Sequence, residues 1–323
     1  MHRYATYTYC GEDFRPGRKI FPMSCTPKHA PPAPAFPEPA ELASTLHACL
    51  PEFGRIGWEQ TTGSTNADLM RQLRGSGAGG STPWLLGAHL QTAGRGRVGR
   101  VWENQVGDAL MFSCAFIANI PLPTLPGLSP ALGVAACEAL RGLLRDPASG
   151  GAQRLVLKWP NDIQFDDAKL AGILVETAFQ SGTPGVTVVA GIGLNLRGAG
   201  RLARSLGRAV ADWDSVPKPG PFNPSAADIV AAIARAWVGA VGDYAQAGYA
   251  VFQRRFDRLD ALAGACVEVI DQGRTVQGGI ACGTDPEGRL LLSTPQGRFP
   301  VLVGDVSVRP QSGVGKGNHD HSA

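Results

Sequence analysis

The chain has 323 residues, of which 44% are hydrophobic and 18% are charged, and its formal net charge is +3. This composition fits one large folded domain with a smaller one, or two domains. The near-neutral charge disfavours a general nucleic-acid or membrane-surface binder, and the apolar runs are too short to span a bilayer. Seven scattered cysteines without a CxxC pair predict reduced thiols, so we expect a cytoplasmic protein.

The first 40 residues are rich in proline and alanine and have no hydrophobic period, so we expect a flexible leader over 1–40. Beyond it, apolar residues recur at helical or strand spacing. The predicted helices cover residues 40–50, 64–75, 129–144, 226–246 and 251–262. The predicted strands of this part of the chain cover residues 54–60, 84–91, 109–118, 154–159, 169–179 and 185–196.

Three short polar residues, Ser64, Thr65 and Asn66, stand at the start of the predicted helix 64–75. One of them is needed as the N-cap, and capping alone is the structural alternative. Three exceed that need, and together they offer both donors and acceptors. We therefore expect them to bind the polar head of a small ligand, such as a urea group.

The predicted strand 84–91 runs into a loop that reads QTAGRGRVGRVW over residues 91–102. The loop lacks the Lys-Ser/Thr ending of a phosphate-binding P-loop. It matches the dinucleotide string GxGxxG at 94–99, but no helical period follows. Glycines let backbone N–H groups approach an anion, and arginines bind carboxylate or phosphate as planar forks. An anion-binding loop is the preferred interpretation, and a nucleic-acid contact is the rival one.

Two lysines, Lys158 and Lys169, flank the turn in KWPNDIQFDDAKLAGILVE at 158–176. Solvated lysines on a polar hairpin are the structural alternative. Lys169, however, opens the apolar strand LAGILVE, which should hold its stem and present a fixed point charge to a carboxylate or phosphate. Farther along, glycines alternate in AGIGLNL at 190–196. They indicate either close approach of a ligand or backbone, or tight strand packing.

From about residue 265 the chain becomes a series of short strands with glycine turns, which predicts a small separate β domain. We therefore divide the chain into the leader 1–40, a catalytic domain 41–262, a C-terminal domain 263–310 and a flexible tail 311–323.

Taken together, STN, QTAGRGRVGRVW, KWPNDI with KLAGILVE, and GIGLNL resemble biotin protein ligases over roughly residues 55–310. The resemblance implies an α/β (α+β) fold of the class II aminoacyl-tRNA synthetase and biotin ligase type. In that fold a mixed β-sheet is flanked by helices and followed by a small C-terminal SH3-like barrel. Members that also repress transcription begin with a winged helix-turn-helix. Residues 1–40 do not resemble one, so we expect a ligase that does not bind DNA.

The resemblance also implies an activity. Biotin and ATP, with Mg²⁺, form biotinyl-5′-AMP, and the biotinyl group passes to one lysine of the biotin carboxyl carrier protein of acetyl-CoA carboxylase. A homodimer is compatible with it, and no residues are assigned as metal ligands. By motif match, the biotin contacts fall on Ser64, Thr65, Asn66, Gln91, Arg95, Gly96 and Arg97. Lys169 matches the catalytic lysine, aided by Arg95 and Arg97, while Asn195, Arg309 and Trp213 match nucleotide contacts.

Two alternatives remain at this point. A lipoate ligase shares the fold class and the acyl-adenylate chemistry, although GRGRxGRxW and KWPND favour biotin. A non-enzymatic nucleic-acid-binding module would use the GRGR loop, and the low net charge argues against it.

Overall fold

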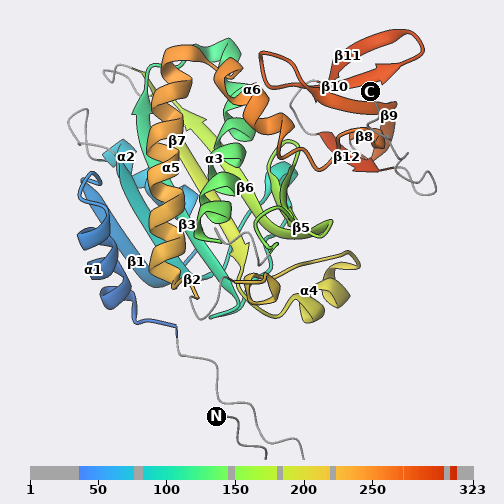
Figure 1. The fold of residues 1–323 in the computed structure, drawn as a ribbon. Helices are drawn as coiled ribbons and strands as arrows, with labels where there is room; N and C mark the ends of the chain where they lie inside the picture. The colour runs from blue at the N-terminus through green and yellow to red at the C-terminus, as the bar shows by residue number, and fades with distance from the viewer. Residues whose placement is uncertain are drawn as a thin grey trace, which may run out of the picture. The chain divides into compact units, whose positions relative to one another are not determined.

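A seven-stranded mixed sheet forms the larger part of the protein (Figure 1). The computed structural model describes residues 36–75, 83–144, 150–179, 185–218, 223–271, 273–301 and 306–310. Strand order is β1-β2-β3-β7-β6-β5-β4. β1 and β2 run parallel, and the other neighbouring pairs are antiparallel. The strands are β1 (Arg55–Thr62), β2 (Trp84–Gln91), β3 (Ala109–Ala118), β4 (Leu155–Lys158), β5 (Asp162–Phe165), β6 (Ala168–Ala178) and β7 (Val186–Asn195).

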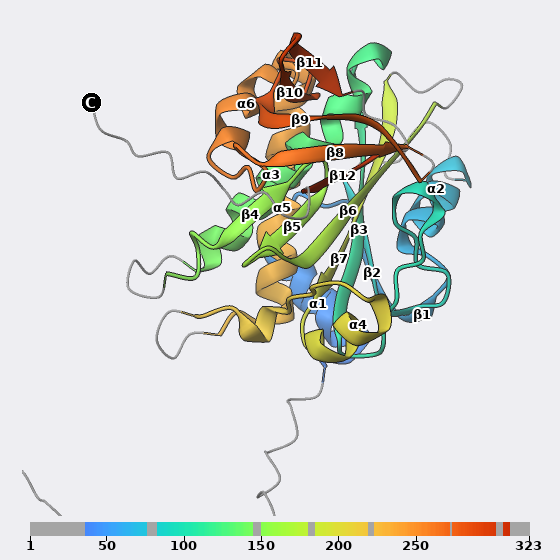
Figure 2. The same cartoon turned by 90° about the vertical axis from the view of Figure 1, so that its right-hand side faces the viewer.

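Helices cover both faces of this sheet, which confirms the predicted mixed sheet flanked by helices. The helices are α1 (Pro39–Cys49), α2 (Thr65–Gly75), α3 (Leu128–Leu143), α4 (Ala199–Leu206), α5 (Ala226–Ala247) and α6 (Ala250–Asp257). The central strands are apolar on both sides because α3 and α5 pack on one face and α2 on the other (Figures 1 and 2).

The α2 face of the sheet has its own small core. Leu69 and Leu73 of α2 pack against Leu86, Ala115 and Val189 of three neighbouring strands. Side chains alternate between the faces of a strand, so every second residue along these strands faces α2. The same alternation brings the polar and glycine positions of the predicted motifs to this face.

The chain is already packed before residue 41, which the sequence assigned to the leader. The Phe36 ring lies edge-on to His89, with centroids 4.7 Å apart. The Nε1–H of Trp58 donates to His89 Nδ1 (2.9 Å), so the proton is on Nε2, which donates to the Pro37 carbonyl (2.9 Å). Helix α1 begins at Pro39, and the rest of the expected leader, 1–35, lies outside the described residues.

These contacts predict where the chain can be shortened. Removing residues 1–40 deletes the Phe36–His89 ring pair and the Pro37 acceptor, so we expect the free energy of unfolding to fall by about 1–3 kcal/mol. Removing only residues 1–35 keeps both contacts and should leave stability unchanged. Denaturant unfolding of the two shortened proteins measures the difference, and equal stabilities would refute the role of Phe36 and Pro37.

The C-terminal part forms a second, antiparallel sheet in the order β11-β10-β9-β8-β12 (Figure 2). The strands are β8 (Cys266–Asp271), β9 (Arg274–Thr284), β10 (Leu290–Thr294), β11 (Gly297–Val301) and β12 (Val306–Pro310). The turn between β9 and β10 contacts the larger sheet, since the buried indole of Trp159 donates to the Gly288 carbonyl (2.9 Å). The separate C-terminal β unit is therefore present, and its closure into an SH3-like barrel remains a prediction.

A buried carboxyl lies on the segment that joins α6 to this second sheet. Asp260 Oδ1 accepts from the Leu262 N–H (2.8 Å), while Oδ2 is buried without a partner among the described residues. Burial raises the pKa of Asp260 from 3.8 to about 6, with a smaller opposing effect of the Leu262 hydrogen bond. The folded state therefore binds this proton more tightly than the unfolded state does.

This raised pKa predicts a loss of stability as pH increases. The contribution of Asp260 is present below about pH 4 and is lost as pH rises through about 6, at a cost of no more than roughly 3 kcal/mol. We expect Asp260→Asn to flatten that part of the stability profile. Urea unfolding between pH 4 and pH 7.5 measures it, with exposed Asp243→Asn as control. An unchanged slope in Asp260→Asn would contradict the assignment.

Among the described residues, none of the helices has the length and apolar character needed to cross a membrane.

Candidate functional site

A cavity of about 590 Å³ opens on the α2 face of the larger sheet. It brings together eight of the residues predicted from sequence: Ser64, Thr65, Asn66, Gln91, Arg95, Gly96, Arg97 and Lys169. Lys158 and Asp162 of the KWPND segment line it as well, as does Val308 of β12. Segments far apart in the sequence therefore meet in one pocket, with the C-terminal sheet at its edge.

The lining is rich in positive charge. Its basic side chains come from the Arg/Gly loop, from the KWPND region and from the residues after α4: Arg95, Arg97, Arg100, Lys158, Lys169 and Arg208. Asp162 is the acidic residue in the described lining. A pocket with this charge favours an anionic ligand.

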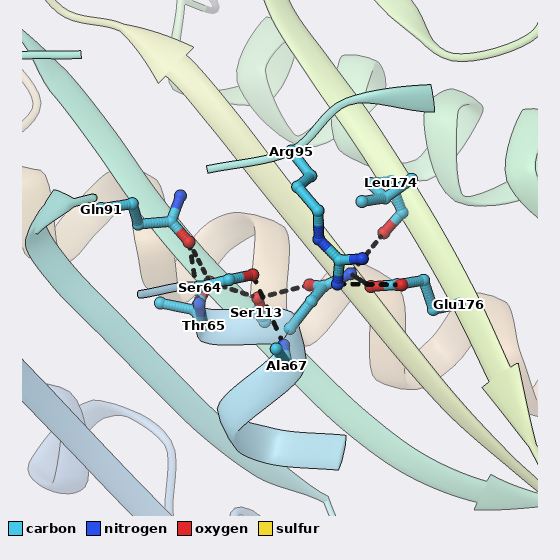
Figure 3. Close-up of polar contacts among 9 residues, drawn as sticks. Ser64, Thr65, Ala67, Gln91, Arg95, Ser113, Leu174 and Glu176 are labelled. Carbon is cyan, nitrogen blue, oxygen red and sulfur yellow. Dashed lines mark hydrogen bonds and ion pairs between the residues drawn. The ribbon is translucent and has the colours of Figure 1, made fainter. Parts of the chain in front are cut away.

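The floor of the cavity is a directed chain of hydrogen bonds (Figure 3). Asn66 Oδ1 accepts from the hydroxyl of Ser113 (2.6 Å), and the Thr65 hydroxyl lies within hydrogen-bond distance of both Ser113 Oγ (2.6 Å) and Gln91 Oε1 (3.2 Å). The Thr65 backbone N–H donates to Gln91 Oε1 (2.8 Å), and the Gln91 amide nitrogen points away from Thr65 (Figure 3). These hydrogen bonds fix the orientation of the Asn66 and Gln91 side-chain amides on the floor.

Asn66 is held from three sides. Its Nδ2 donates to Glu176 Oε2 (2.9 Å) and to the Leu174 carbonyl (3.3 Å), and it is 4% exposed. A Cβ added to Gly191 would lie 2.2 Å from Asn66 Oδ1. A buried amide held by these hydrogen bonds has a fixed orientation. Ser64 has the capping role, because its hydroxyl accepts from the Ala67 N–H (3.4 Å).

The alternating glycines of β7 make room for side chains. Gly191 accommodates Asn66, and a Cβ on Gly193 would lie 2.4 Å from the indole of Trp102. Both glycines also line the cavity. Tight packing is therefore the alternative that the structure shows, and it positions two residues that line the cavity, Asn66 and Trp102.

The Arg/Gly loop, residues 91–102, lines the cavity and is closed by contacts between its own residues. The Gly96 N–H donates to the Arg100 carbonyl (2.7 Å), and a β-bridge joins Arg95 to Val101. At its base, the Asn104 side chain donates to the Gln91 carbonyl (2.9 Å) and accepts from the Gln91 N–H (3.1 Å). Val101 is 77% exposed. The loop is anchored at its two ends and exposed between them.

Lys169 reaches the cavity because β6 contains a bulge. Ile163 pairs with Ala171 while the next residue, Gln164, pairs with Lys169, so β6 has one extra residue there. Such a bulge re-aims the side chain beside it. It puts Lys169 on the same face as Gly172, whose added Cβ would lie 2.9 Å from the Lys169 ammonium nitrogen.

The ammonium of Lys169 is fixed by two neighbours. Its Nζ lies 2.6 Å from Asp162 Oδ1 and 5.6 Å from the centroid of the Trp102 ring. The side chain is 18% exposed. A partly buried ammonium paired with one carboxylate is held in place at the wall of the cavity.

The three predicted nucleotide contacts are Asn195, Trp213 and Arg309, and the first two are not among the described residues that line the main cavity. Asn195 is buried and lies outside the main cavity, and its Nδ2 donates to the carbonyls of Lys169 (3.3 Å) and Ala211 (3.1 Å). Trp213 is 2% exposed, does not line the main cavity and has Lys218 Nζ 5.2 Å from its ring centroid. Arg309 belongs to β12, and its side chain lies outside the described residues.

Four residues of the site had no role assigned from the sequence: Ser113, Trp102, Glu176 and Asp162. Ser113 had one available signal, because it is a lone hydroxyl in the otherwise apolar strand 109–118. Within the described part of the chain, no group of three or more His, Cys, Asp or Glu side chains could hold a metal ion.

Comparisons with known proteins find relatives of this chain in one family. A model described as the Biotin/lipoate A/B protein ligase family matches residues 78–195. The biotin--[acetyl-CoA-carboxylase] ligase of Paracoccus denitrificans is 32% identical over 254 residues, which cover 76% of this chain and 97% of that protein. The bifunctional ligase/repressor BirA of Escherichia coli is 31% identical over 224 residues. That alignment covers 69% of this chain and 65% of BirA, so the chain spans less than two thirds of that relative.

A solved structure with a similar fold is the biotin protein ligase from Aquifex aeolicus in complex with biotin and ATP. It aligns with a TM-score of 0.62 at 23% identity, over 80% of this chain and all (100%) of that one. At this identity the likeness supports the fold.

Proposed function

The chain belongs to the biotin protein ligase family, and we propose that it activates biotin with ATP and transfers the biotinyl group to a lysine of a carrier protein. The observation that carries the proposal is the cavity itself, where a polar floor lies beside a strongly basic wall. The floor suits the ureido head of biotin, which has both N–H donors and a carbonyl acceptor. The basic wall suits the biotin carboxylate and the phosphates of ATP.

The polar floor also favours biotin over lipoate, although lipoate ligases use the same acyl-adenylate chemistry. Lipoate has an apolar dithiolane ring in place of the ureido group, so it would offer no N–H donor to the Asn66 oxygen and no carbonyl acceptor to the Gln91 amide nitrogen. A site built to hydrogen-bond a substrate rejects an analogue that lacks the matching groups by far more than it rejects a change in size. We propose Ser64, Thr65, Asn66, Gln91 and Gly96 as biotin contacts.

The first chemical step joins two anions. A carboxylate oxygen of biotin forms a bond to the α-phosphorus of ATP, and the bond from that phosphorus to the pyrophosphate oxygen breaks. We propose that Lys169, Arg95 and Arg97 offset the repulsion and the charge that develops. Asn195 would act through Lys169, whose backbone it holds. Packing of Trp213 on adenine and contact of Arg309 with the nucleotide stay predictions.

The second step releases AMP. The amine of the carrier lysine, after losing a proton, attacks the biotinyl carbon, a new amide forms and the bond to the phosphate oxygen breaks. The exposed crown of the Arg/Gly loop supports a closing role that keeps water from the adenylate until the carrier arrives.

Mg²⁺ is part of the proposal as a companion of ATP. The described lining offers one carboxylate, Asp162, which suits an ion held mainly by substrate phosphates and water. When bound, the ion would neutralise charge on the phosphates.

We further propose the domain roles and surroundings. The catalytic domain, assigned to residues 41–262, supplies the cavity, and the C-terminal domain, assigned to 263–310, supplies its edge through Val308. We propose a cytoplasmic protein that acts on the biotin carboxyl carrier protein of acetyl-CoA carboxylase and forms a homodimer, which sedimentation would measure.

The test is direct. Purified protein with biotin, ATP and Mg²⁺ should label a purified biotin carboxyl carrier domain, detected by a mass increase on a single lysine. Lipoate supplied in place of biotin, with its own carrier domain, is the matched arm. Equal labelling with lipoate, or no labelling with biotin, would overturn the proposal.

A further inference from the structure

The side chain of Glu176, on β6, contacts both the floor of the cavity and the Arg/Gly loop (Figure 3). One carboxylate oxygen, Oε2, accepts from Asn66 on the floor (2.9 Å). The other, Oε1, accepts from Arg95 of the Arg/Gly loop (3.3 Å). A single residue therefore holds the ligand-facing amide of the floor and an arginine of the loop at the same time.

The contact with Arg95 is of a kind that breaks easily. Arg95 is 48% exposed and Glu176 is 33% exposed, and ion pairs at such exposure contribute little to stability. The contact with Asn66 is different, because Asn66 is buried and makes its hydrogen bonds inside the fold. Glu176 therefore has one permanent partner and one exchangeable partner.

We propose that Glu176 is a positioning residue that holds Arg95 in the ligand-free protein and releases it when biotin binds. This inference depends on the proposed function for the identity of the ligand. Glu176 is the anion that Arg95 contacts, and the arginine points down from the loop toward the floor (Figure 3). In the bound state Arg95 serves the ligand, and Glu176 continues to orient Asn66.

Two substitutions separate the two partners of Glu176. Glu176→Gln keeps a carbonyl oxygen that accepts from Asn66. Its amide NH₂ group then faces Arg95, and this NH₂ group cannot accept a hydrogen bond from the guanidinium. Glu176→Ala removes both partners. If Glu176 competes with the ligand for Arg95, a larger fraction of the Glu176→Gln molecules has Arg95 released from residue 176. The apparent affinity for the ligand then rises in proportion to that fraction.

The affinity experiment has opposite signs for the two variants. By calorimetry, Glu176→Gln should bind biotin about two- to fivefold more tightly than the wild type, the range expected for a half-exposed ion pair. Glu176→Ala should bind biotin about fivefold or more weakly, because Asn66 loses its partner. A purely structural role predicts weaker binding in both variants, and that result, or unchanged binding in Glu176→Gln, would overturn the proposal.

A second measurement requires no ligand, so it is independent of the proposed function. The loop contains Arg95, Arg97 and Arg100, which are trypsin sites. We expect cleavage within 95–101, followed by mass spectrometry, to be about two- to fivefold faster in Glu176→Gln than in the wild type. Glu59→Gln makes the same charge change at an exposed site on β1 and should not alter the rate. Equal rates in all three proteins would refute the holding of Arg95.

Discussion

Replacing Lys169 with glutamine should slow formation of the adenylate by about a hundred- to a thousandfold, while biotin binding changes little. Glutamine keeps the length and polarity of the side chain and loses the charge. The bulge in β6, Asp162 and the backbone contacts of Lys169 with Ala209 and Ala211 all fix the position of this ammonium. Removing a fixed charge that stabilises a transition state costs about 3–4 kcal/mol of barrier.

The two chemical steps can be measured separately. Pyrophosphate release in a single turnover reports adenylate formation, and transfer from synthetic biotinyl-AMP to a carrier domain reports the second step. We expect transfer to suffer less, because only one of the two anionic reactants remains. Lys158→Gln is the matched control, since Lys158 lines the same cavity from the end of β4. Normal adenylate formation in Lys169→Gln, together with slow formation in Lys158→Gln, would exchange the two roles.

Most residues that line the cavity could be predicted from the sequence because they lie in contiguous motifs. STN, GRGRVGRVW and KLAG each specify residue types whose chemistry is local, and the structure brings their side chains to one cavity. The individual strands followed from apolar runs at strand spacing, and the mixed sheet followed from the resemblance to biotin protein ligases. The motifs did not specify which face of β6 carries the Lys169 side chain, because the bulge that directs it into the cavity depends on pairing with β5.

The parts that the sequence did not predict depend on contacts between distant residues. Helix α4 was missed because it has one buried apolar residue, Leu202. Its first N–H is satisfied by Asp212, which lies 13 residues away in the chain (2.8 Å). Glu176 gave no signal because its two partners come from α2 and from the loop. The end of α6 at Asp257 was also missed, since the segment after it pairs with β4 instead of continuing the helix.

A single added methyl group at Gly191 should weaken biotin binding by about thirty- to a hundredfold. The Cβ of alanine would lie 2.2 Å from Asn66 Oδ1 and 3.0 Å from Ser113 Oγ, so the amide must leave its position against β7. Ser113 then loses its acceptor, Glu176 loses a donor and the ligand loses a fixed oxygen. Two to three lost hydrogen bonds at about 1 kcal/mol each give this range.

The cause of the effect can be isolated with a double-mutant cycle. If Gly191→Ala acts by displacing Asn66, then Asn66→Ala should weaken biotin binding by a similar factor, and the double variant should be no worse than either single one. Gly239→Ala in α5 is the control, because its added Cβ meets nothing within 4 Å. Circular dichroism confirms that each variant is folded before calorimetry with biotin. Additive losses in the double variant would mean that Gly191 affects the ligand by a route other than Asn66, and the geometry of the floor would then have to be assigned differently.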